Sequence, residues 1–99
     1  MFYQKVYSLL KKVPKGKVTT YKDLAKALHS KAYRAVGTAM RLNKNAPIVP
    51  CHRVVNSDGS VGYYSGKGGI KVKIILLEKE GVEVKNNKIE NFKKKLFKF

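Results

Sequence analysis

The sequence predicts a mainly α-helical domain, α/β only in a loose sense, built from a winged-helix-like helix-turn-helix and a short β-hairpin. The segments 2–13, 21–42 and 70–80 repeat apolar side chains at the spacing of amphipathic helices. The stretches between them alternate apolar and polar residues only briefly, so regular strand content should be low. The chain has 99 residues and a hydrophobic content of 43%, enough for one core, and it contains no internal repeat.

The first helix is expected over residues 2–13, where one stripe is formed by Val6, Leu9, Leu10 and Val13. The turn sequence PKG should end it, because proline and glycine interrupt helices. A short extended piece, KVTT at 17–20, follows this turn.

The next segment has the signals of two short helices. Thr20 is placed as an N-cap with Asp23 three residues later, a capping-box-like arrangement that predicts a helix from Tyr21 to about Leu28. In the turn HSK, Ser30 can cap a second helix that runs from about Ala32 to Leu42. Two short helices joined by a tight turn are the outline of a helix-turn-helix.

The second of these helices is unusually slim. It carries small residues at Ala32, Ala35, Gly37 and Ala39. Gly37 in a helix interior costs about 1 kcal/mol relative to alanine. Two interpretations remain open: the helix packs tightly against another helix, or it lies in a DNA groove with Arg34 and Arg41 projecting.

The second half of the chain should contain a hairpin and a covering helix. RVV, NSDG and SVGYY indicate strand, turn and strand over residues 53–64, followed by the glycine-rich loop SGKGG. The helix over 70–80 should turn Ile70, Ile74 and Leu77 inward, and Gly81 should stop it. Residues 1–84 are then expected to form one domain. The basic tail, residues 85–99, is expected to be a short terminal helix or a frayed arm.

The charge of the chain favours a polyanionic partner. Twenty-two Lys and Arg residues against six Asp and Glu give a net charge of +16. Such an excess favours nucleic acid over an anionic membrane surface, although a lysine-rich surface kept for solubility would have the same composition. No signal peptide is expected, and the longest apolar run, IILL at 74–77, is too short to span a bilayer.

The single cysteine, Cys51, excludes an internal disulfide and favours a reducing, cytoplasmic location. No metal site is expected, because one cysteine and two histidines do not make a four-ligand zinc site. Cys51 is followed by His52 and Arg53 and preceded by Pro50. A thiol attacks only as thiolate, so it needs a base or a positive field, and a water could connect Cys51 to His52 if the backbone turns. Taken alone, a lone cysteine is more often an inert, buried residue.

Four blocks of sequence carry a family resemblance. PCHRVV resembles the active-site signature of the O6-alkylguanine-DNA alkyltransferases, also called methylated-DNA–protein-cysteine methyltransferases. VTTYKDLA, RAVGTAMRLN, PIVPCHRVVNSDGSVGYYSG and VKIILLEKEG resemble successive blocks of that family, in order, over residues 3 to about 84.

The resemblance implies a DNA repair enzyme that acts on duplex DNA containing O6-alkylguanine. Such a protein rotates the damaged guanine out of the helix, because its O6 substituent cannot be reached inside the stack. Cys51 then takes the alkyl group irreversibly, once per molecule. The resemblance implies no cofactor, no membrane partner and a monomer.

The catalytic roles implied by the resemblance fall on five residues. His52 would deprotonate Cys51 through a water, and Glu80 would fix the histidine tautomer. Asn43 would hold that water and brace the loop. Tyr21 would donate to guanine N3 and offset the negative charge that develops on the leaving base.

The resemblance also implies a DNA-contacting set and a pocket. The DNA-contacting residues would be Thr20, Tyr21, Arg34, Ala35 and Arg41, with Arg34 entering the space that the flipped nucleotide vacates. The pocket residues would be Met40, Val54, Tyr64 and Ser65. Of these, Ser65 would stabilise the base at O6, and the carbonyls of Cys51 and Val54 would accept from its exocyclic amine.

Two departures and two alternatives accompany the resemblance. Most family members have an additional N-terminal domain, and the link YYSGKGGIKVK is about two residues longer than usual, which affects the register of Ser65. One alternative is a non-catalytic lesion-binding module like the alkyltransferase-like proteins, which have tryptophan in place of the cysteine; this chain contains no tryptophan. The other is a helix-turn-helix regulator, which the alanine-lined second helix disfavours.

Overall fold

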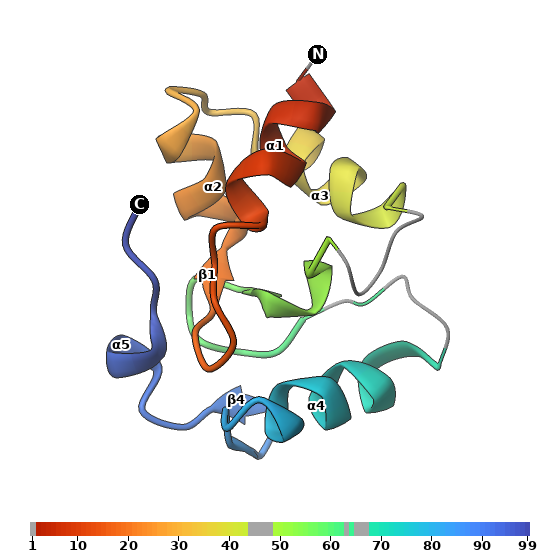
Figure 1. Ribbon diagram of the computed structural model, residues 1–99, viewed down its shortest axis with the longest axis vertical. Helices are drawn as coiled ribbons and strands as arrows, with labels where there is room; N and C mark the ends of the chain where they lie inside the picture. The colour runs from red at the N-terminus through yellow and green to blue at the C-terminus, as the bar shows by residue number, and fades with distance from the viewer. Residues whose placement is uncertain (1, 44–48, 63, 65–67) are drawn as a thin grey trace.

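The computed structural model describes residues 2–43, 49–62, 64 and 68–99. Helices α1, α2 and α3 gather at one end of the molecule and α4 covers the other, with β1, β2 and the turn η1 between them (Figure 1). The predicted mainly helical fold is confirmed. In chain order the elements are α1 (Phe2–Leu10), β1 (Thr19–Thr20), α2 (Tyr21–Ala27), α3 (Tyr33–Arg41), η1 (Cys51–Arg53), β2 (Val54–Val55), α4 (Gly69–Lys79), β3 (Val84–Lys85), β4 (Lys88–Ile89) and α5 (Phe92–Lys95).

Helix α1 is shorter than its apolar pattern indicates. It buries Val6 and Leu10 and ends at Leu10. The following amides tighten the chain: Lys12 N–H donates to Leu9 and Val13 N–H to Leu10, at 3.0 Å each. These bonds span three residues, as in a 3₁₀ turn, so the apolar stripe extends to buried Val13 without a longer α-helix.

The predicted helix-turn-helix is formed by α2 and α3. The hydroxyl of Thr20 accepts the backbone N–H of Asp23 at 3.0 Å, so Thr20 is the N-cap of α2. Ser30 bonds the N–H of Ala32 at 3.0 Å, and α3 begins one residue later, at Tyr33. Helix α1 packs against both helices and fixes their relative position.

The strand pairing around β2 corrects the sequence prediction. Among the described residues, 53–55 form no strand ladder with 60–62 or 64: β2 instead pairs in parallel with β1, Thr19 opposite Val54 and Thr20 opposite Val55. Residues 56–60 close a compact turn, and Ser60 forms an antiparallel bridge with Lys88. The hairpin of the fold lies further along the chain, where β3 pairs with β4.

A buried lysine binds both of the segments that were predicted as the strands of that hairpin. Lys73 of α4 donates from Nζ to the carbonyls of Val54 (2.7 Å) and Val61 (2.6 Å), which would otherwise belong to the two predicted strands. The fully buried residues of α4 are Lys73 and Leu77, and Ile74 is partly buried against the second core cluster, as predicted. The prediction that Ile70 turns inward is wrong, since its side chain is 43% exposed.

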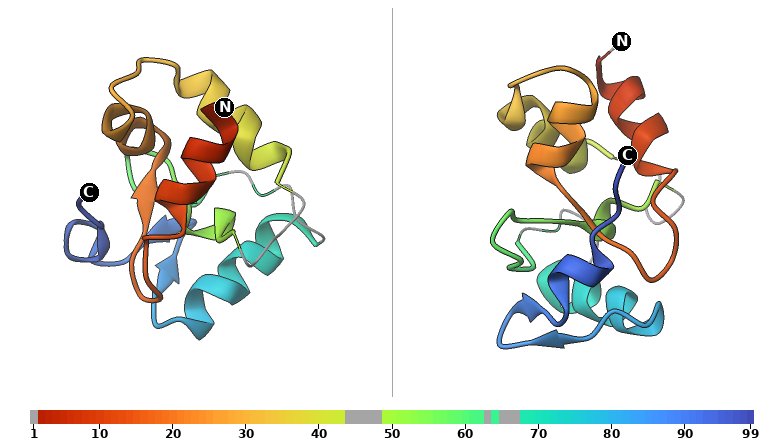
Figure 2. Two further views of the ribbon diagram at one scale, coloured as in Figure 1. Left: turned by 45° about the horizontal axis from the view of Figure 1, so that its top comes forward. Right: turned by 90° about the vertical axis from the view of Figure 1, so that its left-hand side faces the viewer.

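The C-terminal segment folds against the body of the domain. The hairpin turns at Asn86 and Asn87, both with positive φ, a conformation that asparagine tolerates better than most residues. Val18 N–H donates to Lys95 and Phe97 N–H donates to Val18, so the chain after α5 runs beside Val18 (Figure 2). Ile89 is buried, and Phe92 and Phe97 each pack against a core cluster.

The core has two parts. One, under α1, α2 and α3, contains Cys51; the other lies between α4 and the C-terminal hairpin. Within the described residues, no helix has the length and apolar character needed to cross a membrane.

Candidate active site

Cys51 lies at the junction of the two halves of the molecule. It opens the 3₁₀ turn η1, which follows Pro50 and ends where β2 begins. Cys51 is 4% exposed and His52 is 1% exposed, and both belong to the buried interior. The turn removes the strand geometry that would point these neighbours to opposite faces.

Glu80 is brought to His52 by the end of α4. His52 Nε2 lies 3.1 Å from Glu80 Oε2. Because a carboxylate can only accept, the imidazole proton resides on Nε2, and Nδ1 keeps its lone pair. Nδ1 is buried and has no hydrogen-bond partner in the part of the chain that the structure describes. The arrangement leaves one basic nitrogen directed away from the carboxylate.

Arg53 holds the same carboxylate. Its Nε donates to Glu80 Oε1 at 2.9 Å and its Nη2 to Oε2 at 2.6 Å, a bidentate contact. Its Nη1 donates to the carbonyl of Val13 at 2.7 Å, which ties the end of α1 to the site. Sequence analysis placed Arg53 beside the cysteine but did not predict that it orients Glu80.

These contacts set the charge states of the histidine and the glutamate. Burial raises the pKa of Glu80, but the hydrogen bonds from Arg53 and His52 outweigh it, so the pKa lies below its ordinary value. Burial lowers the pKa of His52, and the contact with Glu80 opposes this only in part. At neutral pH the pair is therefore a carboxylate and a neutral imidazole, which can accept a proton.

The thiol itself is not ionised by its surroundings. Burial raises the pKa of Cys51, while a hydrogen bond with Asn43 and the positive charge of Lys73 lower it in part. The sequence suggested a thiol activated by a positive field; the field is present, but burial outweighs it. Deprotonation therefore needs a base when the thiol reacts.

Lys73 is a residue of the site that sequence analysis missed. Its side chain is fully buried, and burial lowers its pKa to about 8, opposed by the charge of Cys51. The available signal was its position four residues before Leu77 on the inward face of the helix. The sequence analysis made no prediction for this lysine, and lysine is rarely buried without partners.

The predicted pocket residues are only partly described. Met40, Val54 and Tyr64 belong with Cys51 to one buried cluster, and burial raises the pKa of Tyr64, with Cys51 adding to the effect. Ser65 lies outside the described residues. The carbonyl oxygen of Val54 already accepts a hydrogen bond from Lys73. Its second lone pair is the one that could accept from the exocyclic amine of a guanine base.

Asn43 and Tyr21 lie at the two ends of the helix-turn-helix. Asn43, just after α3, donates from Nδ2 to the carbonyl of Val49 at 2.8 Å and so connects the two sides of segment 44–48, which lies outside the described residues. Tyr21 is half-buried at the first position of α2.

The predicted DNA-contacting residues do not all face solvent. Arg34 and Arg41 are exposed and line, with Gly37 and Thr38, a hollow of about 440 Å³ on α3. Among the described residues, a Cβ at Gly37 would meet nothing within 4 Å, so this glycine is not required for packing against the other described helices. Ala35 is half-buried, while Thr20 is 3% exposed and uses its hydroxyl to cap α2.

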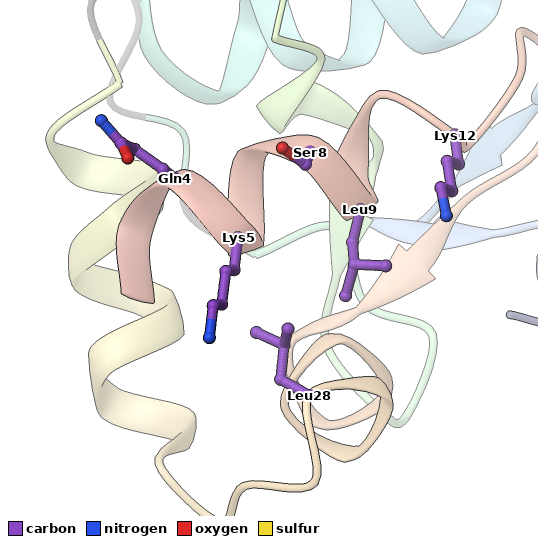
Figure 3. Close-up of a pocket in the computed structure, with 6 residues that line it drawn as sticks. All are labelled: Gln4, Lys5, Ser8, Leu9, Lys12 and Leu28. Carbon is purple, nitrogen blue, oxygen red and sulfur yellow. The ribbon is translucent and has the colours of Figure 1, made fainter. Parts of the chain in front are cut away.

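A second hollow contains none of the predicted catalytic or DNA-contacting residues. It measures about 320 Å³ and is lined by Gln4, Lys5, Ser8, Leu9, Lys12 and Leu28, from α1 and the end of α2 (Figure 3). None of these residues belongs to the predicted site. In the described part of the chain, no three His, Cys, Asp or Glu side chains come together in a way that could hold a metal.

Comparison with known proteins points to one family. Residues 1–82 match the family described as 6-O-methylguanine DNA methyltransferase, DNA binding domain. A methylated-DNA–protein-cysteine methyltransferase of Thermococcus kodakarensis is 55% identical over 83 residues, which are 83% of this chain and 45% of that protein. A bifunctional methyltransferase/endonuclease of Picrophilus torridus is 46% identical over 89 residues, 89% of this chain and 29% of that protein. The chain spans less than half the length of either curated relative.

Solved structures extend the similarity to the C-terminal segment. The structure of S. pombe Atl1 in complex with damaged DNA containing O6-carboxymethylguanine is similar with a TM-score of 0.86 and 33% sequence identity. The similarity covers 99% of this chain and 95% of that one. The fold described above, C-terminal segment included, therefore has a counterpart in a protein of nearly the same size.

Proposed function

Because the chain belongs to the 6-O-methylguanine DNA methyltransferase family, we propose that it repairs DNA by transferring an alkyl group from O6-alkylguanine to Cys51. The family resemblance noted in PCHRVV is confirmed by the match over residues 1–82. The proposed partner is duplex DNA that contains the lesion, and the proposed reaction occurs once per protein molecule.

One observation carries the proposal: Cys51 and His52 share the buried turn η1, and Glu80 at the end of α4 lies 3.1 Å from His52 Nε2. A structural cysteine needs neither a neutral histidine next to it nor a fixed carboxylate behind that histidine. A nucleophile, a base and an orienting acid in this order are the arrangement that activates weak nucleophiles.

The transfer step is a displacement at the alkyl carbon. The sulfur of Cys51 forms a bond to this carbon while the bond from carbon to O6 breaks, and the bonding electrons remain on guanine. The proton of the thiol passes to Nδ1 of His52, through a water in our proposal, and Glu80 stabilises the imidazolium that results. The product is a thioether, a poor leaving group, so the alkyl group stays on the protein.

The remaining residues are proposed to hold the base. Tyr21 donates to guanine N3 and Ser65 to O6, which offsets negative charge on the leaving base. Asn43 orients the bridging water. Arg34, exposed on α3, occupies the space left by the extruded nucleotide, and Arg41 contacts the backbone.

A second candidate function is lesion binding without transfer. It is favoured by the similarity to Atl1, whose structure contains damaged DNA and whose length matches this chain. The presence of Cys51 with its histidine and glutamate favours transfer, because binding alone does not use them.

Intact-protein mass spectrometry separates the two functions. After incubation with a duplex containing O6-methylguanine, we expect the protein to gain the mass of one methyl group, and Cys51→Ala to gain none. The same protein should bind an undamaged duplex without any mass change. Saturable binding of the damaged duplex with no added mass on the wild-type chain would establish the binding function instead.

A further inference from the structure

The C-terminal segment is rich in positive charge, and its last residues lie beside α2. Residues 85–99 contain six lysines and one glutamate, a net charge of +5 in fifteen residues. Lys93, Lys94 and Lys98 are exposed, beyond the residues 1–82 that match the family.

Two adjoining hollows connect this segment to α2. One, of about 400 Å³, lies between α2 and the chain end and is lined by Asp23, Lys26, Ala27, Leu96, Phe97, Lys98 and Phe99. The other, of about 320 Å³, lies at the turn before α3 and is lined by Lys22, Lys26, His29, Ser30, Lys31 and Tyr33. Lys26 lines both, so a strip in which lysines outnumber the single carboxylate, Asp23, runs from the helix-turn-helix across α2 to the C-terminal residues.

The segment is held in place rather than free. The backbone of Val18 forms two hydrogen bonds with this segment. Its carbonyl accepts Phe97 N–H at 2.7 Å, and its N–H donates to the carbonyl of Lys95 at 2.8 Å. Lys17 Nζ donates to the carbonyl of Lys94 at 2.8 Å, and the rings of Phe97 and Phe99 meet edge to face, with centroids 5.2 Å apart. Lysines on a fixed backbone lose less conformational entropy when they bind than lysines on a free arm.

The opposite end of the molecule holds half of the acidic residues of the chain. Glu78, Glu83 and Glu90 line a hollow together with Val84 and Lys85. This hollow is formed by the end of α4 and the C-terminal hairpin, which lie at the end away from α2 and α3 (Figure 1). The lysines at this end therefore stand among carboxylates, which oppose the approach of a polyanion.

We infer that Lys94 and Lys98, with Lys22 and Lys26 of α2, form a second strip of phosphate contacts for duplex DNA, beside the contacts of the helix-turn-helix. The inference rests on the proposed function, which supplies the duplex. The first helix of a helix-turn-helix crosses the DNA backbone, so a strip that continues from α2 meets further phosphates of the same duplex. Such contacts add affinity and salt dependence without reading sequence or lesion.

The test compares two double variants of the full chain that remove the same charge. Lys94→Gln/Lys98→Gln removes the proposed contacts, and Lys79→Gln/Lys85→Gln removes two exposed lysines at the acidic end. Binding of an undamaged duplex is measured by fluorescence anisotropy over a series of salt concentrations. Each lost phosphate contact lowers the magnitude of the slope of log K against log salt by about 0.9.

For Lys94→Gln/Lys98→Gln we expect a slope smaller by one to two, on the order of one unit per contact, and weaker binding at low salt. The control should keep the wild-type slope. Equal slopes in the two variants would overturn the inference and leave duplex binding intact, since net charge alone would then explain the effect. A wild-type chain that binds no duplex would overturn both the inference and the proposed function.

Discussion

The buried centre around Cys51 and the exposed face of α3 use charge in opposite ways. In the centre, Glu80, Arg53 and Lys73 are each satisfied by specific partners at 2.6 to 3.1 Å, and pKa values shift with burial. On α3, Arg34 and Arg41 are exposed around a hollow. A change of charge in the centre should therefore act on the stability of the fold and on its pH dependence. A change on α3 should act on DNA affinity.

The largest effect is expected from Glu80→Gln. The amide cannot accept all three hydrogen bonds, so Arg53 keeps a nearly buried, unpaired charge and His52 loses its orienting acid. Removing one partner of a buried pair costs about 3 kcal/mol or more, and we expect alkyl transfer to slow by about 100-fold. Urea denaturation and the rate of mass gain measure the two effects.

Glu78→Gln is the matched control, because it removes the same charge from an exposed position two residues earlier. Its effect on stability should stay within about 0.5 kcal/mol. If both variants changed stability and rate alike, the distinction between the centre and the surface would fail at this carboxylate.

Lys73→Met should have an intermediate effect that depends on pH. The folded-state pKa of Lys73 is about 8, against 10.5 for an ordinary lysine, so the unfolded chain holds this proton more tightly. The stability of the wild type, measured relative to Lys73→Met, should therefore rise as the pH rises from about 8 to 10.5. The total rise is at most about 3 kcal/mol.

Lys73→Met should also affect the reaction. Its charge opposes the rise in the pKa of Cys51, so its removal should slow transfer at neutral pH by about tenfold, the effect of one pKa unit. The midpoint of the pH–rate profile should move to higher pH. If the stability of the wild type and of Lys73→Met changed with pH in parallel, and the midpoint of the pH–rate profile did not move, Lys73 would be a solvated lysine like those on the surface.

Features that depend on neighbouring residues or on a family motif could be predicted from the sequence, and features that depend on distant residues could not. Thr20 was predicted as an N-cap because its partner lies three residues away, and Cys51, His52 and Glu80 were placed by a family motif. Burial of Lys73 depends on two carbonyls that are 19 and 12 residues distant, which no local pattern contains. The parallel pairing of β1 with β2 is equally non-local.

The C-terminal hairpin was also not predicted, although in this case the signal is local. The stretch EVKNNKIE contains a local turn signal, since Asn-Asn between alternating residues favours a two-residue hairpin loop. The lysine-rich composition of residues 85–99 suggested a tail, although Phe92 and Phe97 were available to pack on the core. The lysine-rich composition of this segment indicated its exposed surface, and the spacing of its apolar residues indicated that it packs on the core.

The smallest effect, and the sharpest test of the exposed face, is expected from Gly37→Ala. A methyl group at this position meets nothing within 4 Å, so the helix should gain about 1 kcal/mol of stability. The same methyl group enters the hollow between Arg34 and Arg41, where a DNA groove would approach the backbone, so affinity for duplex should fall several-fold, about 1 kcal/mol. Thermal melts and anisotropy titrations would measure changes of opposite sign. Because stability alone would favour alanine here, a rise in stability with unchanged affinity would mean that α3 does not enter the groove and that its small residues have no role in DNA approach.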